Sequence, residues 1–585
     1  MNHPLAQVRP SQLRSLLSDS LTLIHDRSVA NLPFQILTTL AHRAKNQLIQ
    51  ETKQPLATQE QYLKTLLQHH RNTELGQHYH LEEIKTIDQF RSRLPILPYS
   101  AYDPYTERIA QGEKNILTPD PVIYINVTSG STGKQKKIPV TQRFQNSLGK
   151  ANLASMGFLD SALRQRGKKL EKLLVTNPAL IKGYTTGGIK YGPAGPGVLH
   201  TRRWLYEWLF AHPFTTLQVE DSFTRNYLCL LFSLRDETLG GIIANFPMLI
   251  LRICRYLEEY AESFVDDLER GSLPSWLNLD PKMRSRLNRR FSAAPKRSQQ
   301  LREILQSEGR LTPPLAWKNL AYIATARGGT SDFYFQHFSD YDLDQLPAFG
   351  AAYSTAEGTC GVYTDVNVDA SVLTPNTGFF EFIPESQWDE ENPDTLLATE
   401  VKPRERYRIL MTNYSGFYRY DIGDVVEISD FYEQTPTLIF RHRRGGILSS
   451  TTEKTTEAHV TAVMRSLQQE WGITVHDFFV TLSEKEFPPH YLLNIELPSE
   501  IELKESEHFL RRFDEILKET NPHYGLKRSG EVPPPRLRIL ATGSFDIVRQ
   551  RQIDRGIPDS QLKFPHISED RQLFAGLTVE KEITL

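Results

Sequence analysis

The sequence predicts an α/β protein with a large N-terminal domain, built of mixed sheets flanked by helices, and a small α+β C-terminal domain. The 585 residues exceed what one hydrophobic core usually holds, which favours a large domain plus a smaller one. After an N-terminal helical region, strand-like runs alternate with helical patterns, which is typical of an α/β body. A break near residue 443 separates a last helix-and-strand segment from this body.

The first expected elements are helices, in a layer covering about residues 35–100. The stretches "PFQILTTLAHRAKNQLIQETK" (33–53) and "TQEQYLKTLLQHHR" (58–71) repeat apolar residues at spacings of three and four, which predicts amphipathic helices. Four nearby histidines suggest a zinc site, but their adjacent and alternate spacings do not share one helical face. We therefore expect a solvated helix end at His69, His70, His78 and His80.

From Pro121 the pattern changes to strands alternating with helices. "VIYINV" (122–127), "LAYIAT" (320–325) and "GFFEFIP" (378–384) predict strands, and "DSFTRNYLCLLFSLRD" (221–236) predicts a helix. The most apolar stretch is "LGGIIANFPMLILRICRYL" (239–257). Polar residues and a proline interrupt it, so it falls short of the roughly 20 apolar residues of a membrane span, and we expect one or two buried helices there.

The predicted domain boundary divides the chain into residues 1–443 and 444–585. Gly445 and Gly446 relax the backbone there and predict a hinge that makes the small domain mobile. Beyond it, Val460, Val463, Met464 and Leu467 share one face of a predicted helix. Strand-like runs and a second helix follow, at 473–482, 491–497, 509–517 (the helix) and 536–540.

Composition and charge bound the function. There are 68 Lys and Arg against 70 Asp and Glu, a net charge of −2, so no global field attracts nucleic acid or an acidic membrane. Cys229, Cys254 and Cys360 are odd in number and far apart, which fits a reducing compartment and argues against a thiolate metal cluster. The first residues lack an apolar segment of signal-peptide length. We expect a cytoplasmic protein, and its size favours an enzyme.

The stretch "NVTSGSTGKQKKIPVT" (126–141) is the first candidate binding site. A Walker A loop requires G-x-x-x-x-G-K-[ST], and here the position five before Gly133 is Thr128. Strand-like runs on both sides predict strand, loop, strand. Gly130 and Gly133 still allow backbone N–H groups to converge on an anion, helped by neighbouring hydroxyls and by Lys136 or Lys137. Taken alone, the pattern favours a polar hairpin loop with solvated lysines over a phosphate-binding site.

Two later motifs give this loop a context. "YSTAE" (353–357) and "YDIGD" (420–424) follow "TSGSTG" (128–133) in the order that characterises the adenylate-forming superfamily, which includes acyl-CoA synthetases and luciferases. From about residue 35 to 570 the chain most resembles the Gretchen Hagen family of acyl acid amido synthetases, the auxin-responsive promoter family. It departs from that family at Ala356, where the family has serine, and at Asp421, where the family has a basic residue.

The resemblance implies a role for each motif residue. Tyr353 would lie on the adenine, Asp424 would accept hydrogen bonds from the ribose, and Glu357 would act in catalysis by holding Mg²⁺. Without the resemblance, these three would be read as a core aromatic, a turn residue after Gly423 and a surface acid. The small domain would supply Lys563 as the catalytic lysine. The residues expected to bind ATP are Thr128, Ser129, Gly130, Ser131, Thr132, Gly133, Lys136, Tyr353, Ser354, Thr355, Ala356, Asp424 and Lys454.

The resemblance also implies the reaction. ATP and Mg²⁺ would activate a small carboxylic acid as an acyl-adenylate, and an amine, expected to be an amino acid, would then accept the acyl group. Two alternatives stay open: transfer to coenzyme A as a thioester, and a non-catalytic homologue that binds nucleotide or acyl ligand. We expect no nucleic-acid or membrane partner and a monomer or weak dimer. Nothing in the sequence identifies the acid or the acceptor.

Overall fold

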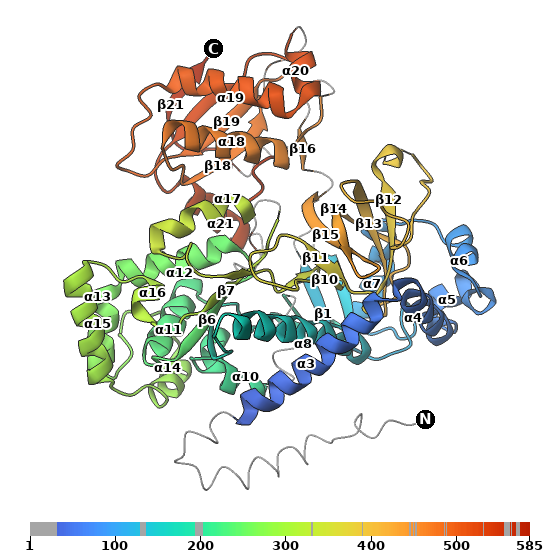
Figure 1. Ribbon diagram of the computed structural model, residues 1–585, viewed down its shortest axis with the longest axis horizontal. Coiled ribbons are helices and arrows are strands. Elements are labelled where there is room, and N and C mark those ends of the chain that lie inside the picture. The colour runs from blue at the N-terminus through green and yellow to red at the C-terminus, as the bar shows by residue number, and fades with distance from the viewer. Residues whose placement is uncertain are drawn as a thin grey trace.

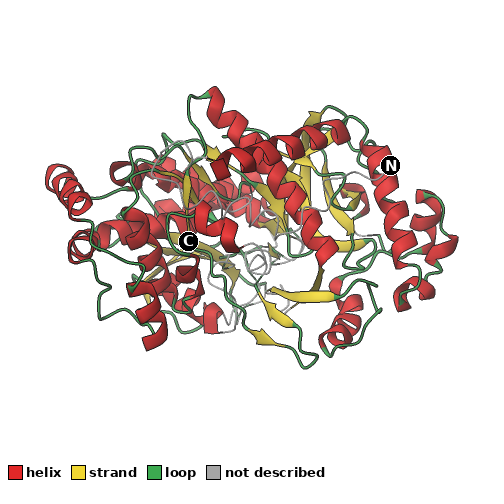
Figure 2. Cartoon of the chain, turned by 90° about the horizontal axis from the view of Figure 1, so that it is seen from below, coloured by secondary structure: helices red, strands yellow, loops and turns green. Residues whose placement is uncertain are grey.

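The computed structural model describes most of the chain (Figure 1). The described residues are 32–128, 136–193, 203–328, 331–388, 390–443, 446–448, 450, 453–484, 486, 488–529, 532–554, 562, 564–568 and 574–585. Helices lie along most of the outline of the molecule and strands toward its middle (Figure 2). The predicted α/β class is confirmed. None of the helices in this part of the chain combines the length and apolarity needed to cross a bilayer.

The N-terminal helical layer is confirmed. Its longest helix, α3, packs along α8 (Gln142–Gln165), and a 2.7 Å contact joins His42 Nε2 to the buried Asp160 carboxylate between them. His78 and His80 are exposed, as expected of a solvated helix end, and the half-buried His69 contacts Asp120 at 2.9 Å. The expectation is wrong for His70, which is buried and contacts the hydroxyl of Tyr418. The layer comprises α3 (Leu32–Thr52), α4 (Pro55–His70), α5 (Glu74–His78), η2 (Leu81–Glu83), α6 (Ile87–Arg93) and α7 (Tyr99–Ala110).

A parallel four-stranded sheet forms the centre of the first core. Its strands, in spatial order, are β3 (Lys172–Val175), β6 (Leu239–Ile243), β7 (Tyr322–Ala324) and β8 (Ala348–Phe349). The helices and turns packed around it are α10 (Arg203–Leu209), η3 (Phe214–Gln218), α11 (Ser222–Leu234), α12 (Pro247–Glu259), α13 (Ala261–Arg270), α14 (Pro281–Asn288), α15 (Pro295–Glu308), α16 (Pro313–Ala316), α17 (Ser331–Phe335) and η4 (Gln336–Tyr341). The helix predicted over 221–236 is α11, and Asp221 caps it by accepting from the Thr224 N–H at 2.7 Å.

One prediction in this core is wrong. The apolar stretch 239–257 is not purely helical: it begins with strand β6 and becomes helix α12 at Pro247. Apolar runs on a doubly covered parallel strand lack the alternation that marks an exposed strand, so strand and helix look alike in sequence. Glycine suits position 241 of β6, because the Cβ of any other residue would lie 2.5 Å from the Tyr322 ring on β7 and clash with it.

Two further sheets complete the large domain. A four-stranded sheet has the order β2 (Lys136–Thr141), β1 (Val122–Thr128), β5 (Lys190–Gly192) and β4 (Gly183–Tyr184). An antiparallel seven-stranded sheet packs against the N-terminal helices and forms a second core with them. Its order is β12 (Phe379–Pro384), β13 (Arg406–Thr412), β14 (Tyr420–Tyr432), β15 (Thr435–Arg443), β11 (Ser371–Leu373), β10 (Thr359–Val362) and β9 (Ala352–Ser354); the turn η5 (Glu385–Gln387) follows β12.

The C-terminal segment has its own core and lies above the large domain in Figure 1. Helices α18 (Glu457–Trp471) and α19 (Ser506–Thr520) pack together, and all four apolar residues predicted on one face of α18 are buried. The predicted α+β pattern is confirmed, while the boundary at 443/444 and the hinge stay predictions. The other elements are β16 (Ile447–Leu448), β17 (Thr455–Thr456), β18 (Asp477–Leu482), β19 (Tyr491–Glu496), α20 (Pro522–Arg528), β20 (Arg536–Leu540), α21 (Ser544–Asp554) and β21 (Val579–Thr584).

Candidate active site

The glycine-rich loop joins two antiparallel strands. β1 ends at Thr128, β2 begins at Lys136, and these two residues pair across the ladder. A Walker A loop opens a helix, so a strand beginning at Lys136 excludes that motif, and the two predicted strands are confirmed. The residues predicted to grip the phosphates fall at 129–135, outside the described part of the chain, and are Ser129, Gly130, Ser131, Thr132 and Gly133.

Lys136 brings this hairpin together with both later motifs. Its Nζ donates a hydrogen bond to the Tyr420 hydroxyl at 2.9 Å, and that hydroxyl donates to Glu357 Oε1, also at 2.9 Å. The ammonium lies 4.0 Å from the same carboxylate oxygen. It also lies 5.6 Å from the ring centroids of Tyr420 and Tyr99. A lysine, a phenol and a carboxylate from three motifs therefore form one connected cluster.

The backbone beside Glu357 is held by two asparagines. Asn413 Nδ2 donates to the Glu357 carbonyl at 2.7 Å, and Asn126 Nδ2 donates to the Ala356 carbonyl at 3.2 Å. The Glu357 N–H itself donates to the Thr355 hydroxyl at 3.2 Å. With 4% of its surface exposed, Glu357 is not the surface acid that an isolated reading of the sequence gives. A carboxylate this buried needs partners, and the lysine and phenol supply them.

Tyr353 and Asp424, predicted to hold adenine and ribose, contact each other. The Tyr353 hydroxyl donates to Asp424 Oδ2 at 2.9 Å, and the Tyr353 ring lies 5.9 Å from that of Phe440. Asp424 is buried within β14, opposite Arg443 of β15, so the reading as a turn residue is wrong. The structure thus brings the second and third motifs together at a second point beside the Glu357 cluster.

The remaining residues of the second motif form the turn that leads to Glu357. Ser354 Oγ lies 2.9 Å from the Thr359 hydroxyl, and the Thr355 N–H donates to the Gly358 carbonyl at 2.8 Å. Ala356 packs against the core formed by the seven-stranded sheet and the N-terminal helices. The methyl group at 356, where the family has serine, is accommodated by apolar neighbours.

Asp421, the second departure from the family, belongs to a buried ion pair. Its Oδ2 lies 3.2 Å from Arg408 Nη2 on the neighbouring strand β13, and both side chains are buried. Its Oδ1 accepts the Gly423 N–H at 2.9 Å, which holds the stretch of β14 before Asp424 where the pairing with β13 shifts register. Asp421 therefore supports the third motif. Its basic partner is Arg408 on the neighbouring strand β13.

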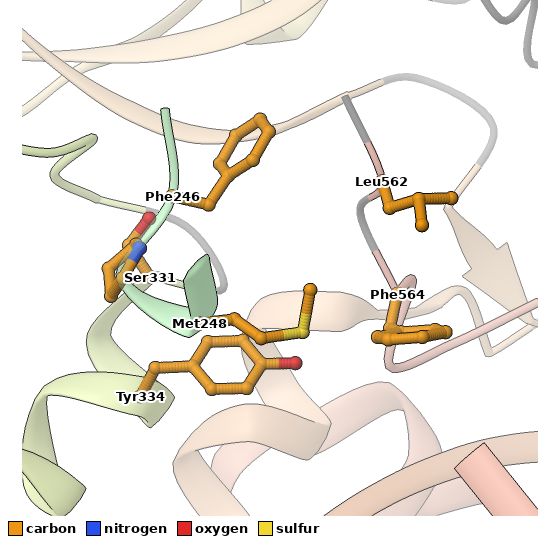
Figure 3. A pocket seen from close by; sticks show the side chains of 7 residues that line it. Phe246, Met248, Ser331, Tyr334, Leu562 and Phe564 are labelled. Atoms are coloured by element: carbon orange, nitrogen blue, oxygen red, sulfur yellow. The ribbon is translucent and has the colours of Figure 1, made fainter. Parts of the chain in front are cut away.

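The two candidate lysines of the C-terminal segment are not placed beside this cluster by any described contact. Lys454 is exposed, with its backbone in the left-handed region at a φ of 51°. Lys563 lies outside the described residues. Its sequence neighbours Leu562 and Phe564 are buried, in a pocket that also includes Met248 (Figure 3). The roles of both lysines stay predictions.

The residues present suit a magnesium ion. Mg²⁺ is usually bound by one or two carboxylates together with substrate phosphates and waters, and Glu357 supplies one carboxylate close to Lys136, at the base of the predicted phosphate loop. Within the described residues, no group of three or more His, Cys, Asp or Glu side chains forms a self-contained metal site. The donor set therefore fits an ion that arrives with a nucleotide.

Sequence reasoning missed the residues that connect these motifs. Tyr420 is the first residue of "YDIGD", and the sequence predicted no role for it. Its hydroxyl can donate a hydrogen bond, and in the structure it donates to the buried Glu357 carboxylate. Asn126, Asn413 and Arg408 act on partners that are far away in sequence, at separations that follow no spacing rule. Their contacts emerge from the sheet order alone.

Tyr420→Phe tests the central hydrogen bond. The change removes the donor to Glu357 and the acceptor of Lys136 while keeping the ring, so we expect the affinity for Mg·ATP to fall about tenfold to a hundredfold. Calorimetric titration of ATP at several Mg²⁺ concentrations measures this. The control is Tyr102→Phe, because the Tyr102 hydroxyl bonds only to the backbone of Tyr418 among its recorded contacts. Equal losses in both variants would contradict a specific role for Tyr420.

Comparison with known proteins gives consistent matches over most of the chain. The family models described as GH3 family N-terminal domain, central domain and C-terminal domain match residues 44–347, 371–443 and 458–572. The jasmonoyl–L-amino acid synthetase JAR4 of Nicotiana attenuata is 28% identical over 548 residues, covering 88% of this chain and 91% of that protein. The indole-3-acetic acid-amido synthetase GH3.10 of Arabidopsis thaliana is 27% identical, covering 81% and 85%.

Solved structures agree on the fold. The GH3.15 acyl acid amido synthetase superposes with a TM-score of 0.80 at 21% identity, covering 92% of this chain and 96% of that one. A 2-hydroxyisobutyryl-CoA ligase in its postadenylation state has a TM-score of 0.54 at 11% identity, covering 88% and 90%. The three domain matches together with the fold establish that this chain belongs to the GH3 family, the Gretchen Hagen family of acyl acid amido synthetases.

Proposed function

We propose that this chain is an acid–amine ligase that activates a carboxylic acid with ATP and transfers the acyl group to an amine. The observation that carries the proposal is the cluster of Lys136, Tyr420 and Glu357 at the base of the glycine-rich hairpin. Membership of the GH3 family and the names of the relatives, which are amido synthetases for jasmonic or indole-3-acetic acid, support it. The adenylate-forming fold supports ATP as the activating substrate.

The chemistry follows from the inertness of a carboxylate, whose delocalised charge repels nucleophiles. In the first step a carboxylate oxygen attacks the α-phosphorus of ATP, the bond to the bridging oxygen breaks, and pyrophosphate leaves. In the second step the amine nitrogen attacks the acyl carbon, AMP departs with the electron pair, and the nitrogen loses a proton. Activation therefore consumes one ATP for each amide formed.

The residues of the site serve the first step by placing charge. Lys136 would stabilise the negative charge that moves onto the leaving pyrophosphate, and its contacts with Tyr420 hold the ammonium in place before the nucleotide binds. Glu357 would hold Mg²⁺, which when bound offsets the repulsion between the two anions. Tyr353 and Asp424 would fix the adenosine so that the α-phosphate faces the carboxylate.

The acceptor is proposed to be an amino acid because the family and the relatives named above make amides. The C-terminal segment would contribute Lys563 during activation and then move away. Lys454 would contact the nucleotide from the same segment. A cytoplasmic location and a monomer or weak dimer remain part of the proposal.

Acid-dependent exchange of labelled pyrophosphate into ATP tests activation directly. We expect exchange with at least one member of a panel that includes jasmonate, indole-3-acetate and benzoate, and formation of a hydroxamate when hydroxylamine replaces the acceptor. The active acid is then offered with the twenty amino acids and, separately, with coenzyme A. Amide without thioester supports the proposal, whereas thioester alone replaces it with an acyl-CoA ligase. ATP binding without exchange across the whole panel would indicate a non-catalytic binding protein.

A further inference from the structure

A buried hydrogen bond joins the large domain to the C-terminal core. The hydroxyl of Tyr334, on α17, donates to Asp477 Oδ2 at 3.2 Å, at the start of β18. Both residues are buried, and the Tyr334 ring is packed as a member of the C-terminal hydrophobic core. A side chain of the large domain thus completes the core of the small one.

An apolar pocket next to this hydrogen bond adds a second contact. Met248, near the start of α12, extends beside the Tyr334 ring and toward Leu562 and Phe564 of the C-terminal segment (Figure 3). Met248 also packs against the C-terminal core, as does Leu251 one turn later. Separating the two parts would expose these apolar surfaces to water.

The position of the joint relates it to the active site. Phe246, in the wall of the same pocket, comes three residues after β6, and Tyr353 comes four residues after β8. Strands β6 and β8 run parallel in one sheet, so their carboxyl ends lie at the same edge of it. The pocket and the second motif therefore both lie at that edge. The joint therefore holds the C-terminal segment against the edge that carries the proposed site.

Asp477 gives the joint a titratable centre. Burial raises the pKa of its carboxyl to about 7, although the Phe478 N–H, the Tyr334 hydroxyl and His476 each favour the ionised form. His566 lies 3.6 Å from Asp477 Oδ1 and stacks on Phe478, but burial lowers its pKa to about 4, so it is neutral here. In the described part of the chain, His476, Glu496, Glu457 and Arg255 are further charged groups around the joint.

We propose that Tyr334 and Asp477 are positioning residues that latch the C-terminal domain in the orientation of this structure for the acid-activating step, and that protonation of Asp477 strengthens the latch. The effect of the latch on catalysis rests on the proposed function.

The direction of the pH effect follows from where the proton binds. In the latched orientation the Asp477 carboxyl is buried with a raised pKa of about 7, whereas in an opened one it would regain water and its ordinary value near 4. The latched orientation therefore binds the proton more tightly. The latched orientation is favoured below pH 7 and becomes less favoured as the pH rises through 7. The equilibrium constant for opening should increase about tenfold between pH 6 and pH 8.

Spin-label distances on the full chain test the latch without any substrate. Lys296→Cys on α15 and Glu507→Cys on α19 are exposed positions, one on each side of the joint, and the three native cysteines are buried. We expect one narrow distance distribution at pH 6, with a second, shifted component growing at pH 8.5. In Tyr334→Phe that component should be present at both pH values, and in Asp477→Asn it should not respond to pH.

A matched control separates the latch from the loss of any buried phenol. Tyr227 donates to Asp267 Oδ2 at 2.7 Å entirely within the large domain, so Tyr227→Phe removes the same kind of hydrogen bond away from the joint. It should leave the distances of the parent unchanged. A pH response that survives in Asp477→Asn, or a Tyr334→Phe variant that behaves like Tyr227→Phe, would overturn the proposal.

The catalytic consequence is read from the two half-reactions. With the acid that best supports pyrophosphate exchange in the parent, Tyr334→Phe should slow exchange about tenfold. Release of AMP from the supplied acyl-adenylate by the amine should stay within about twofold of the parent, because the latch acts before that step. Equal losses in both steps would refute the positioning role. A parent without exchange would refute the proposed function, while the distances would still report the latch.

Discussion

Glu357→Gln is expected to lower acid-dependent pyrophosphate exchange by about a hundredfold to a thousandfold. The amide can still accept the hydrogen bond of Tyr420, so the substitution preserves the local packing and removes the negative charge that faces Lys136 and the proposed Mg²⁺. Exchange rates measured at saturating ATP over a range of Mg²⁺ concentrations check this. A defect caused by lost metal affinity should shrink as Mg²⁺ is raised.

The control for Glu357 is a carboxylate with matching partners outside the site. Asp267 is buried, accepts a hydrogen bond from the Tyr227 hydroxyl and contacts Arg270 at 2.6 Å, so it too combines a phenol donor with a cation. Asp267→Asn should leave exchange per folded molecule within about twofold of the parent. If both variants lose activity to the same extent, the role of Glu357 is structural and the metal assignment is wrong.

The sequence predicted the parts of the fold that depend on local periodicity. The apolar spacings in α18 and α11 are local patterns, and both helices lie within the residues that carry those patterns. The strand–loop–strand around residues 129–135 followed from the β-branched residues and Pro139 next to the loop. The β6 strand was missed because burial on both faces removes the alternation from which strands are recognised.

In the candidate site, too, some residues could be predicted from the sequence and others could not. Glu357, Asp424, Tyr353 and Lys136 came from motif order and resemblance, and the structure brings them together in two linked pairs of contacts. The Tyr334–Asp477 contact spans 143 residues and joins helix α17 of the large domain to strand β18 of the C-terminal core. No periodicity encodes such a pairing, because it depends on how finished units pack. Long-range polar partners are therefore what a single sequence leaves out.

Breaking the buried ion pair between Arg419 and Glu381 from one side should strongly destabilise the large domain. Arg419 directly precedes Tyr420 and donates to both oxygens of Glu381, at 2.9 to 3.2 Å, while its Nη1 donates to backbone carbonyls at Arg91 and Leu94. It thus ties α6 to the strand that opens the third motif. The side chains are 8% and 1% exposed, so removing Arg419 leaves the buried Glu381 carboxylate with weaker partners: the Arg91 guanidinium at 3.6 Å and the Thr395 hydroxyl.

Arg419→Met should therefore destabilise the large domain by about 3–5 kcal/mol, seen as a lower midpoint of its thermal unfolding transition. The double variant Arg419→Met/Glu381→Met removes both charges of the pair and should recover part of that loss, because only Arg91, whose side chain is 23% exposed, then lacks its carboxylate partner. Met at 419 keeps a side chain on the same left-handed backbone, at a φ of 46°, so backbone strain is unchanged.

A double variant no more stable than the single one would mean that the loss comes from the contacts to α6. Tyr420 would then be positioned by that helix, and Tyr420→Phe and Arg419→Met should show the same fall in Mg·ATP affinity.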